Sequence, residues 1–173
     1  MGKWSLTWIL LSSLGYPVLS IVADFPGAYF HEVAMEEQRR FGMRYALVGR
    51  GASKLVDQAL AGNEIVTCCC DVPFRQEKLV KARFGGAELM VDPGTAKLMM
   101  RYSSPILRFT VRTNAEGCDV VRLGPFVSRP SESDPEAATQ NLTQELIDGI
   151  YQDIQARPAE WYGWSFVETQ GGR

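Results

Sequence analysis

The sequence predicts an α/β fold in which helices flank a mostly parallel central sheet and an antiparallel pair of strands follows late in the chain. Helix-like and strand-like segments alternate along most of the 173 residues. One continuous apolar run near the middle is typical of a strand buried on both faces. Two later segments alternate apolar and polar residues around a short turn, as hairpins do. The length fits a single domain over residues 1–173.

In the first part of the chain, helices are expected where apolar residues recur at helical spacing before a glycine, and strands in the short apolar runs between them. The predicted helices cover residues 4–14, 25–41 and 52–61. The predicted strands cover residues 17–22, 43–48 and 64–70. A polar loop over 71–78 follows the last strand, at the end where α/β sheets hold ligands.

The second part begins with a weakly strand-like segment over 84–91, around Gly85-Gly86. Pro93 at the first helical position, with Asp92 as N-cap, predicts a helix to about residue 102. Strands over 105–113 and 118–123 form the expected hairpin, and a loop over 128–134 follows. The longest predicted helix covers 135–156, and one apolar stripe marks its buried face: Leu142, Leu146, Ile147, Ile150 and Ile154.

Composition and cysteine spacing exclude several classes of protein. Hydrophobic residues make up 46% and the net charge is −2, so the chain has neither the composition of a disordered tail nor the basic surface that nucleic acid requires. Cys68, Cys69, Cys70 and Cys118 form no C-x-x-C pair, which argues against structural zinc and a secreted disulfide framework. We expect no metal and no cofactor, with the cysteine run buried in a strand as small reduced hydrophobes.

The apolar N-terminal stretch is interrupted by Gly15-Tyr16-Pro17 and contains several hydroxyl residues. A membrane span needs about 20 predominantly apolar residues. We therefore expect an amphipathic helix that ends at Gly15, followed by a buried strand, instead of a signal peptide or a membrane span.

Near the C-terminus, the run Arg157-Pro158-Ala159-Glu160-Trp161-Tyr162-Gly163-Trp164 follows the longest predicted helix. It resembles the closing signature of the lipid A biosynthesis (lauroyl/myristoyl) acyltransferase family, His/Arg-Pro-x-x-Trp-x-Trp, whose fold is lysophospholipid acyltransferase-like. Other blocks resemble the family in the same order: Gly15-Tyr16-Pro17, the helix and strand over 55–71, Phe84-Gly85-Gly86, the helix start over 93–98, and Ser104-Pro105-Ile106-Leu107. The resemblance implies that the chain is the C-terminal two thirds of the family domain, without its N-terminal part.

The resemblance also implies a function. The family transfers a fatty acyl chain from acyl carrier protein or acyl-CoA to the hydroxyl of a glycolipid or lysophospholipid. The expected partners are therefore the acyl donor, a lipid acceptor and a membrane surface. The expected location is the bacterial cytoplasm, peripheral to the inner membrane.

The catalytic dyad of the family is His-x4-Asp/Glu at the start of a helix, and here the sequence departs from it. In the register set by Gly15, the histidine of the dyad falls one position before Met1. Gly2 and Trp4 then match family residues between the two members of the dyad, and Ser5 stands at the carboxylate position. No residue of the chain is therefore assigned as catalytic, and transfer is expected to be impaired. Three interpretations stay open: a truncated acyltransferase, a non-catalytic lipid- or partner-binding pseudoenzyme of the same fold, and an unrelated α/β protein that binds a small ligand.

A weaker candidate dyad is His31 with Glu36, which repeats the His-x4-Glu spacing. Residues five apart on a helix point about 140° away from each other, which is poor geometry for a hydrogen-bonded pair. A surface position for His31 on an amphipathic helix is the alternative.

The candidate substrate-binding residues are Asp71, Arg75 and Arg83. Asp71 ends the buried strand where the family also has an aspartate, although a solvated turn would explain it as well. Arg75 and Arg83, with Lys78 and Lys81, form the densest basic stretch and are candidates to meet lipid phosphates or an acidic carrier protein, or form a solvated loop. Trp161 and Trp164 are candidates for aromatic anchors at a bilayer or for packing of the last helix. The arginine that the family carries after the first strand is replaced here by Ala23-Asp24-Phe25-Pro26.

Overall fold

The computed structural model describes residues 3, 5–22, 36, 39–49, 51–71, 78–161 and 163–168. They form two compact units, one of Lys3–Cys69 and a larger one made chiefly of Cys70–Arg173. Helices and strands are mixed in both units, with parallel pairing in the first and antiparallel pairing in the second, which confirms the α/β class. The single domain over 1–173 stays a prediction.

The first unit contains a three-stranded parallel sheet of order β2-β1-β3. Its elements are α1 (Ser5–Ser13), β1 (Val18–Val22), β2 (Arg44–Leu47), α3 (Ala52–Ala61) and β3 (Ile65–Thr67). The predicted helix over 25–41 falls mostly outside the described residues. In the central strand β1, Val18 and Leu19 are almost fully buried, as the apolar run predicted.

The cysteine run differs from the prediction, because β3 ends at Thr67 and Cys68–70 continue without regular structure. None of the three forms a disulfide, and all three are half-buried. An apolar run does not by itself say where sheet pairing stops, and here β3 pairs with β1 only as far as the Thr67–Ser20 position. The expectation of a strand to residue 70 with buried cysteines is therefore wrong.

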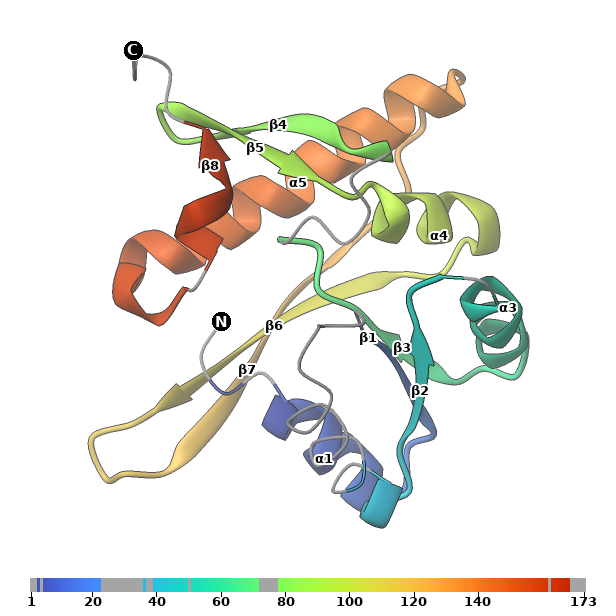
Figure 1. Ribbon diagram of the computed structural model, residues 1–173, viewed down its shortest axis with the longest axis vertical. Helices are drawn as coiled ribbons and strands as arrows, with labels where there is room; N and C mark the ends of the chain where they lie inside the picture. Colours follow the sequence, from blue (N-terminus) through green and yellow to red (C-terminus); the bar gives the residue numbers. More distant parts are fainter. Residues whose placement is uncertain are drawn as a thin grey trace. The chain divides into compact units, whose positions relative to one another are not determined.

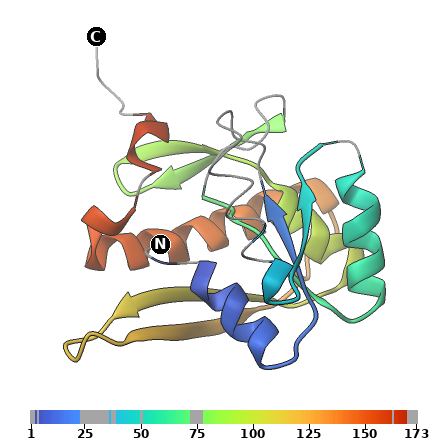
Figure 2. The same cartoon turned by 60° about the horizontal axis from the view of Figure 1, so that its bottom comes forward.

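The second unit contains two antiparallel sheets (Figures 1 and 2). One has the order β4-β5-β8, and the other is the two-stranded ribbon β6-β7. The elements are β4 (Val80–Phe84), β5 (Ala87–Val91), α4 (Gly94–Tyr102), β6 (Ile106–Thr113), β7 (Asp119–Val127), α5 (Pro135–Ala156), the 3-10 turns η2 (Pro158–Glu160) and η3 (Gly163–Phe166), and β8 (Val167–Glu168). The sheet lies on one side of α5 and the ribbon on the other (Figure 2).

Two strands of this unit were incompletely predicted. The segment expected as one weak strand over 84–91 begins at the last residue of β4, turns at Gly85-Gly86 and continues as β5, and the two strands pair as a hairpin over 80–91. Gly85 has φ 62°, in the left-handed region that glycine adopts without strain. The ribbon strand β7 also runs to Val127, four residues beyond the predicted end at 123.

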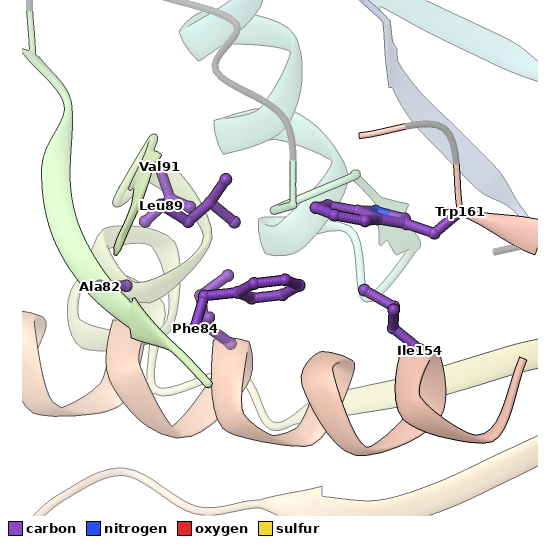
Figure 3. Packing of buried hydrophobic residues seen from close by; sticks show 7 residues of the cluster. Ala82, Phe84, Leu89, Val91, Ile154 and Trp161 are labelled. Carbon is purple, nitrogen blue, oxygen red and sulfur yellow. The ribbon is translucent and has the colours of Figure 1, made fainter. Parts of the chain in front are cut away.

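Helix α5 has the predicted bounds, Pro135–Ala156, because its sequence carries both a start signal and a stripe. The Asp134 carboxylate accepts a hydrogen bond from the Glu136 N–H at 3.1 Å, and Pro135 occupies the first turn. Its apolar stripe enters two hydrophobic clusters. Figure 3 shows the first, in which the Phe84 and Trp161 rings lie over α5 near Ile154. In the second, Leu142 and Leu146 pack with α4 and β7.

Side chains of α5 also complete the outer edge of β4. Gln144 accepts a hydrogen bond from the Arg83 N–H at 2.8 Å and donates to the Arg83 carbonyl at 3.0 Å. One turn earlier, Gln140 donates to the Lys81 carbonyl at 2.8 Å. Since β4 is the edge strand of its sheet, these carboxamides take the place of a neighbouring strand.

Candidate functional site

Ser5, which stands at the expected carboxylate position, is the first residue of α1 and is half-buried. The helix ends as predicted at Gly15, which has φ 85°, and the Tyr16 N–H donates to the Leu11 carbonyl at 3.1 Å. This closing arrangement is typical of a helix C-terminus capped by a left-handed glycine. The structure therefore places Ser5 in the first turn of the helix that precedes Gly15-Tyr16-Pro17.

The alternative dyad is only partly within the described residues, because His31 lies outside them. Glu36 is exposed and forms an ion pair with Arg39 Nη1 at 3.2 Å. Arg39 also donates to the Tyr45 hydroxyl. The hydrogen bond to Glu36 and the neighbouring Tyr45 raise the pKa of the Arg39 guanidinium above its ordinary value. The described partner of Glu36 is thus a surface arginine.

Asp71 has a specific partner that the sequence analysis did not identify. Its carboxylate Oδ2 accepts a hydrogen bond from the Trp161 indole Nε1 at 2.8 Å. Both residues are buried, with exposed fractions of 9% for Asp71 and 2% for Trp161. A buried carboxylate is stable only where hydrogen bonds replace its water, so Trp161 holds Asp71 in place.

Trp161 is itself fixed by aromatic neighbours. Its ring lies 5.0 Å from that of Phe84 and 5.0 Å from that of Trp164, measured between centroids. Tyr151 of α5 meets the edge of Phe84 at 4.9 Å. Such offset and edge-on pairs stabilise one another beyond their area burial. Three blocks that the sequence suggested separately therefore lie together in the structure. Phe84 of the Phe84-Gly85-Gly86 block packs with the two C-terminal tryptophans, and Asp71 forms a hydrogen bond with one of them.

The two tryptophans thus differ in environment. Trp161 is fully buried and packs on the core, which is the second of the two interpretations above. Trp164 is 48% exposed, and its Nε1 donates to the Pro158 carbonyl at 2.9 Å. Trp164 keeps an exposed ring, as an interfacial side chain would need, and the role of bilayer anchor stays a prediction.

The basic stretch is not a continuous loop. Lys81 and Arg83 belong to β4, while Arg75 lies outside the described residues. Lys81 forms an ion pair with Glu88 across the hairpin at 2.8 Å. Arg83 is exposed, and the Gln144 side chain bonds its backbone. The alternation Val80-Lys81-Ala82-Arg83-Phe84 places the two cations on the face opposite to Ala82 and Phe84, which are in the core.

Arg83 also lines a groove that the sequence analysis missed. The groove lies along α5, and Arg108 of β6 and Gly149 of α5 contribute to it as well. The Arg108 guanidinium lies against the backbone of Gly149 and pairs with Asp153 at 3.5 Å. The one sequence signal for this close approach was Gly149 itself, a glycine in the middle of a predicted helix. Its φ is not positive, so the backbone conformation does not require glycine there.

Within the described part of the chain, no three histidine, cysteine, aspartate or glutamate side chains gather as metal ligands. Nor does that part contain a helix of the length and apolarity needed to cross a bilayer.

Comparison with known families gives a match over most of the chain. The model of the bacterial lipid A biosynthesis acyltransferase family matches residues 2–164. The chain belongs to this family. Among the curated proteins, none matches the sequence significantly.

Membership in the lipid A biosynthesis acyltransferase family excludes the third interpretation, that of an unrelated α/β protein. The matched range spans both compact units and includes Ser5, Asp71, Arg83 and the Trp161–Trp164 signature. It supports an acyltransferase-type function in lipid A biosynthesis, which implies an acyl donor and a lipid acceptor in general terms.

Proposed function

We propose that this family member recognises an acyl donor, either acyl carrier protein or acyl-CoA, and a glycolipid or lysophospholipid hydroxyl as acceptor, but is impaired in acyl transfer as the sequence stands. The proposal places it at the cytoplasmic face of the inner membrane, bound to the membrane surface. The observation that carries the impairment is Ser5 at the carboxylate position, in the first turn of the helix that Gly15 ends.

The chemistry explains why Ser5 matters. Transfer requires a base to take the proton of the acceptor hydroxyl as the hydroxyl oxygen attacks the donor thioester carbon. A carboxylate beside that base orients the imidazole and stabilises the imidazolium that forms. A serine hydroxyl carries no negative charge and performs only the first of these tasks. In the serine proteases, loss of the charge on the corresponding orienting carboxylate lowers kcat about 10⁴-fold.

A pseudoenzyme that binds lipid or a partner is the second candidate, and the same Ser5 observation favours it. Asp71 and its aromatic support are present, so the loss at the dyad position is not accompanied by loss of the buried framework around Asp71. The two candidates differ in whether a rebuilt dyad brings back turnover.

An acyl-transfer assay tests the proposal directly. The purified chain is incubated with an acyl carrier protein thioester or acyl-CoA and with a glycolipid or lysophospholipid acceptor, and the product is compared with that of boiled protein. We expect no transfer above the boiled control. Turnover that disappears in His31→Ala would instead assign catalysis to the His31 and Glu36 pair.

A rebuilt dyad provides the positive arm. A histidine placed immediately before Met1, combined with Ser5→Glu, restores the His-x4-Glu spacing in the register of Gly15. Transfer by this variant, and none by the same extension carrying Ser5, would support the acyltransferase interpretation. Liposome flotation of the unchanged chain tests membrane binding separately, and failure to float with vesicles would contradict the proposed location.

A further inference from the structure

The groove along α5 carries full charges of both signs. It has a volume of about 430 Å³ and lies between α5, Arg83 of β4 and Arg108 of β6. Two guanidinium groups and two carboxylates line it: Arg83, Arg108, Glu145 and Asp148. Ordinary small-molecule pockets are mostly apolar with a few polar groups. The lining of this groove therefore favours a charged ligand over an apolar one.

Two of these charges already have a partner within the fold. The Arg108 guanidinium pairs with Asp153 at 3.5 Å, and the Asp148 carboxylate accepts a hydrogen bond from the Gln144 side chain at 2.7 Å. Arg108 is also half-buried, because Gly149 lets its guanidinium lie against the backbone of α5. The fold therefore holds both groups in place before any ligand enters the groove.

The other two charges, on Arg83 and Glu145, are available to a ligand. Both side chains are exposed, and neither forms an ion pair or a side-chain hydrogen bond with another residue of the described ranges. The bonds between Arg83 and Gln144 involve only the backbone of Arg83, so they leave its guanidinium open. The same bonds hold β4 against α5, which keeps the two opposite charges on two walls of one groove.

A ligand with a single charge fits this groove poorly. An anion drawn to Arg83 would meet the carboxylates of Glu145 and Asp148, and a cation drawn to those carboxylates would meet the guanidinium. An uncharged ligand gains no ion-pair attraction at either wall. A zwitterion satisfies both walls at once, because its carboxylate matches the planar fork of Arg83 and its ammonium donates to Glu145.

We propose that the groove over Gly149 binds a small zwitterion of the amino-acid class, with its carboxylate on the Arg83 guanidinium and its ammonium on the Glu145 carboxylate. Asp148, one turn along α5 from Glu145, adds a second negative charge on the ammonium side. The exposed Gln152 carboxamide is a hydrogen-bonding partner for the rest of the ligand. The site lies within the larger compact unit, and the proposal does not rest on acyl transfer.

The test uses the full chain and a series of zwitterions of increasing length: glycine, β-alanine, γ-aminobutyrate and ε-aminohexanoate. Saturation-transfer NMR measures the binding of each, and the series reports which separation of the two charges fits the groove. We expect the tightest of them to bind in the millimolar range, because an open groove with few apolar contacts gives low affinity. The carboxylic acid and the amine of the same chain length each lack one charge and should bind about two- to fivefold more weakly at the same ionic strength.

Single substitutions test the two walls of the groove separately. Arg83→Gln and Glu145→Gln each remove one charge from an exposed side chain and should weaken binding of the zwitterion about two- to fivefold. Glu145→Gln should not weaken binding of the carboxylic acid, because that ligand has no ammonium to place there. Arg122→Gln and Glu136→Gln are the matched controls, since both residues are exposed and lie outside the groove. Circular dichroism verifies that each variant is folded before the titration.

The outcomes separate a zwitterion site from a surface that attracts ions in general. Weaker binding of the zwitterion in both groove variants, with unchanged binding in both controls, supports the proposal. Three results overturn it: no zwitterion binds to the folded chain, the zwitterion binds no better than its singly charged analogues, or the controls weaken binding as much as the groove variants do.

Discussion

At the scale of single residues, the hydrogen bond between Asp71 and Trp161 links positions 90 residues apart. Neither group is satisfied by solvent, since both side chains are buried. Removing one partner leaves the other as an unpaired buried polar group, which costs more than the bond itself contributes. This coupling makes the pair suitable for a double-mutant cycle.

We expect Asp71→Ala and Trp161→Phe each to lower the free energy of unfolding by about 1–3 kcal/mol. The double variant should be less destabilised than the sum, by about 0.5–3 kcal/mol, because the interaction is lost only once. Urea denaturation followed by circular dichroism measures all three. Trp164→Phe is the control, because the Trp164 indole donates to the Pro158 carbonyl and not to Asp71, so its effect should add to that of Asp71→Ala. Strict additivity of Asp71→Ala with Trp161→Phe would contradict the coupling.

Gly149 allows a second test at this scale. Alanine is better than glycine in a helix by about 1 kcal/mol, so propensity alone predicts that Gly149→Ala stabilises the protein. We expect the opposite, a loss of about 1–3 kcal/mol, because the new methyl group overlaps the Arg108 guanidinium. Combining it with Arg108→Ala should remove most of that overlap penalty in thermal denaturation. A stabilised Gly149→Ala single variant would show that Arg108 moves aside freely.

At the scale of elements, α5 organises the second unit. Ile147 and Ile154 of this helix pack against β4 and β5, and Leu142 and Leu146 pack with α4 and β7. Two glutamines of the same helix form hydrogen bonds with the backbone of β4. Gln144 satisfies both backbone groups of Arg83, so the helix and the strand are joined by directional bonds as well as by apolar contact.

Gln144→Ala is therefore expected to destabilise the protein by about 0.5–1.5 kcal/mol, since the exposed Arg83 amide and carbonyl exchange their side-chain partner for water. The amide hydrogen of Arg83 should also exchange faster than in the unchanged chain. Hydrogen-exchange NMR measures the second effect at that residue. Gln155→Ala, on an exposed position of the same helix, should change neither quantity, and an unaltered Arg83 exchange rate in Gln144→Ala would contradict the role given to this side chain.

At the scale of the whole molecule, the described residues form two compact units, and the expectation of a single domain can be tested through their tryptophans. Trp8 is buried in the Lys3–Cys69 unit and Trp161 in the other. With 5-fluorotryptophan in both positions, 19F NMR follows each unit during urea unfolding. A single domain predicts the same midpoint for both resonances. Separate midpoints would show two domains that unfold independently.

Local signals predicted local structure well. The apolar stripe of α5 predicted that helix with its bounds, and Gly15 predicted the end of α1; the structure adds the Asp134 cap. The strand β4 was missed although Val80-Lys81-Ala82-Arg83-Phe84 alternates perfectly, because its two cations were interpreted as a solvated loop. The end of β3 was placed too late because pairing partners, not apolarity, determine where a strand stops.

The site was less predictable for a physical reason. The position of Asp71 indicated a role at a strand end, but its partner Trp161 comes from a distant segment, and only the fold brings the two together. Likewise the groove depends on Arg108 crossing Gly149, a contact between a strand and a helix that no local pattern encodes. The family blocks were recognisable in order, whereas their mutual contacts were not.

The glutamine side chains on α5 have a consequence for solubility. An edge strand with open backbone groups is a template for adding a strand from another chain, which leads to aggregation. Gln140 and Gln144 occupy that edge of β4, so an incoming strand would first have to displace carboxamides already bonded to it. The helix thus protects the sheet against intermolecular strand addition while it holds the sheet in place.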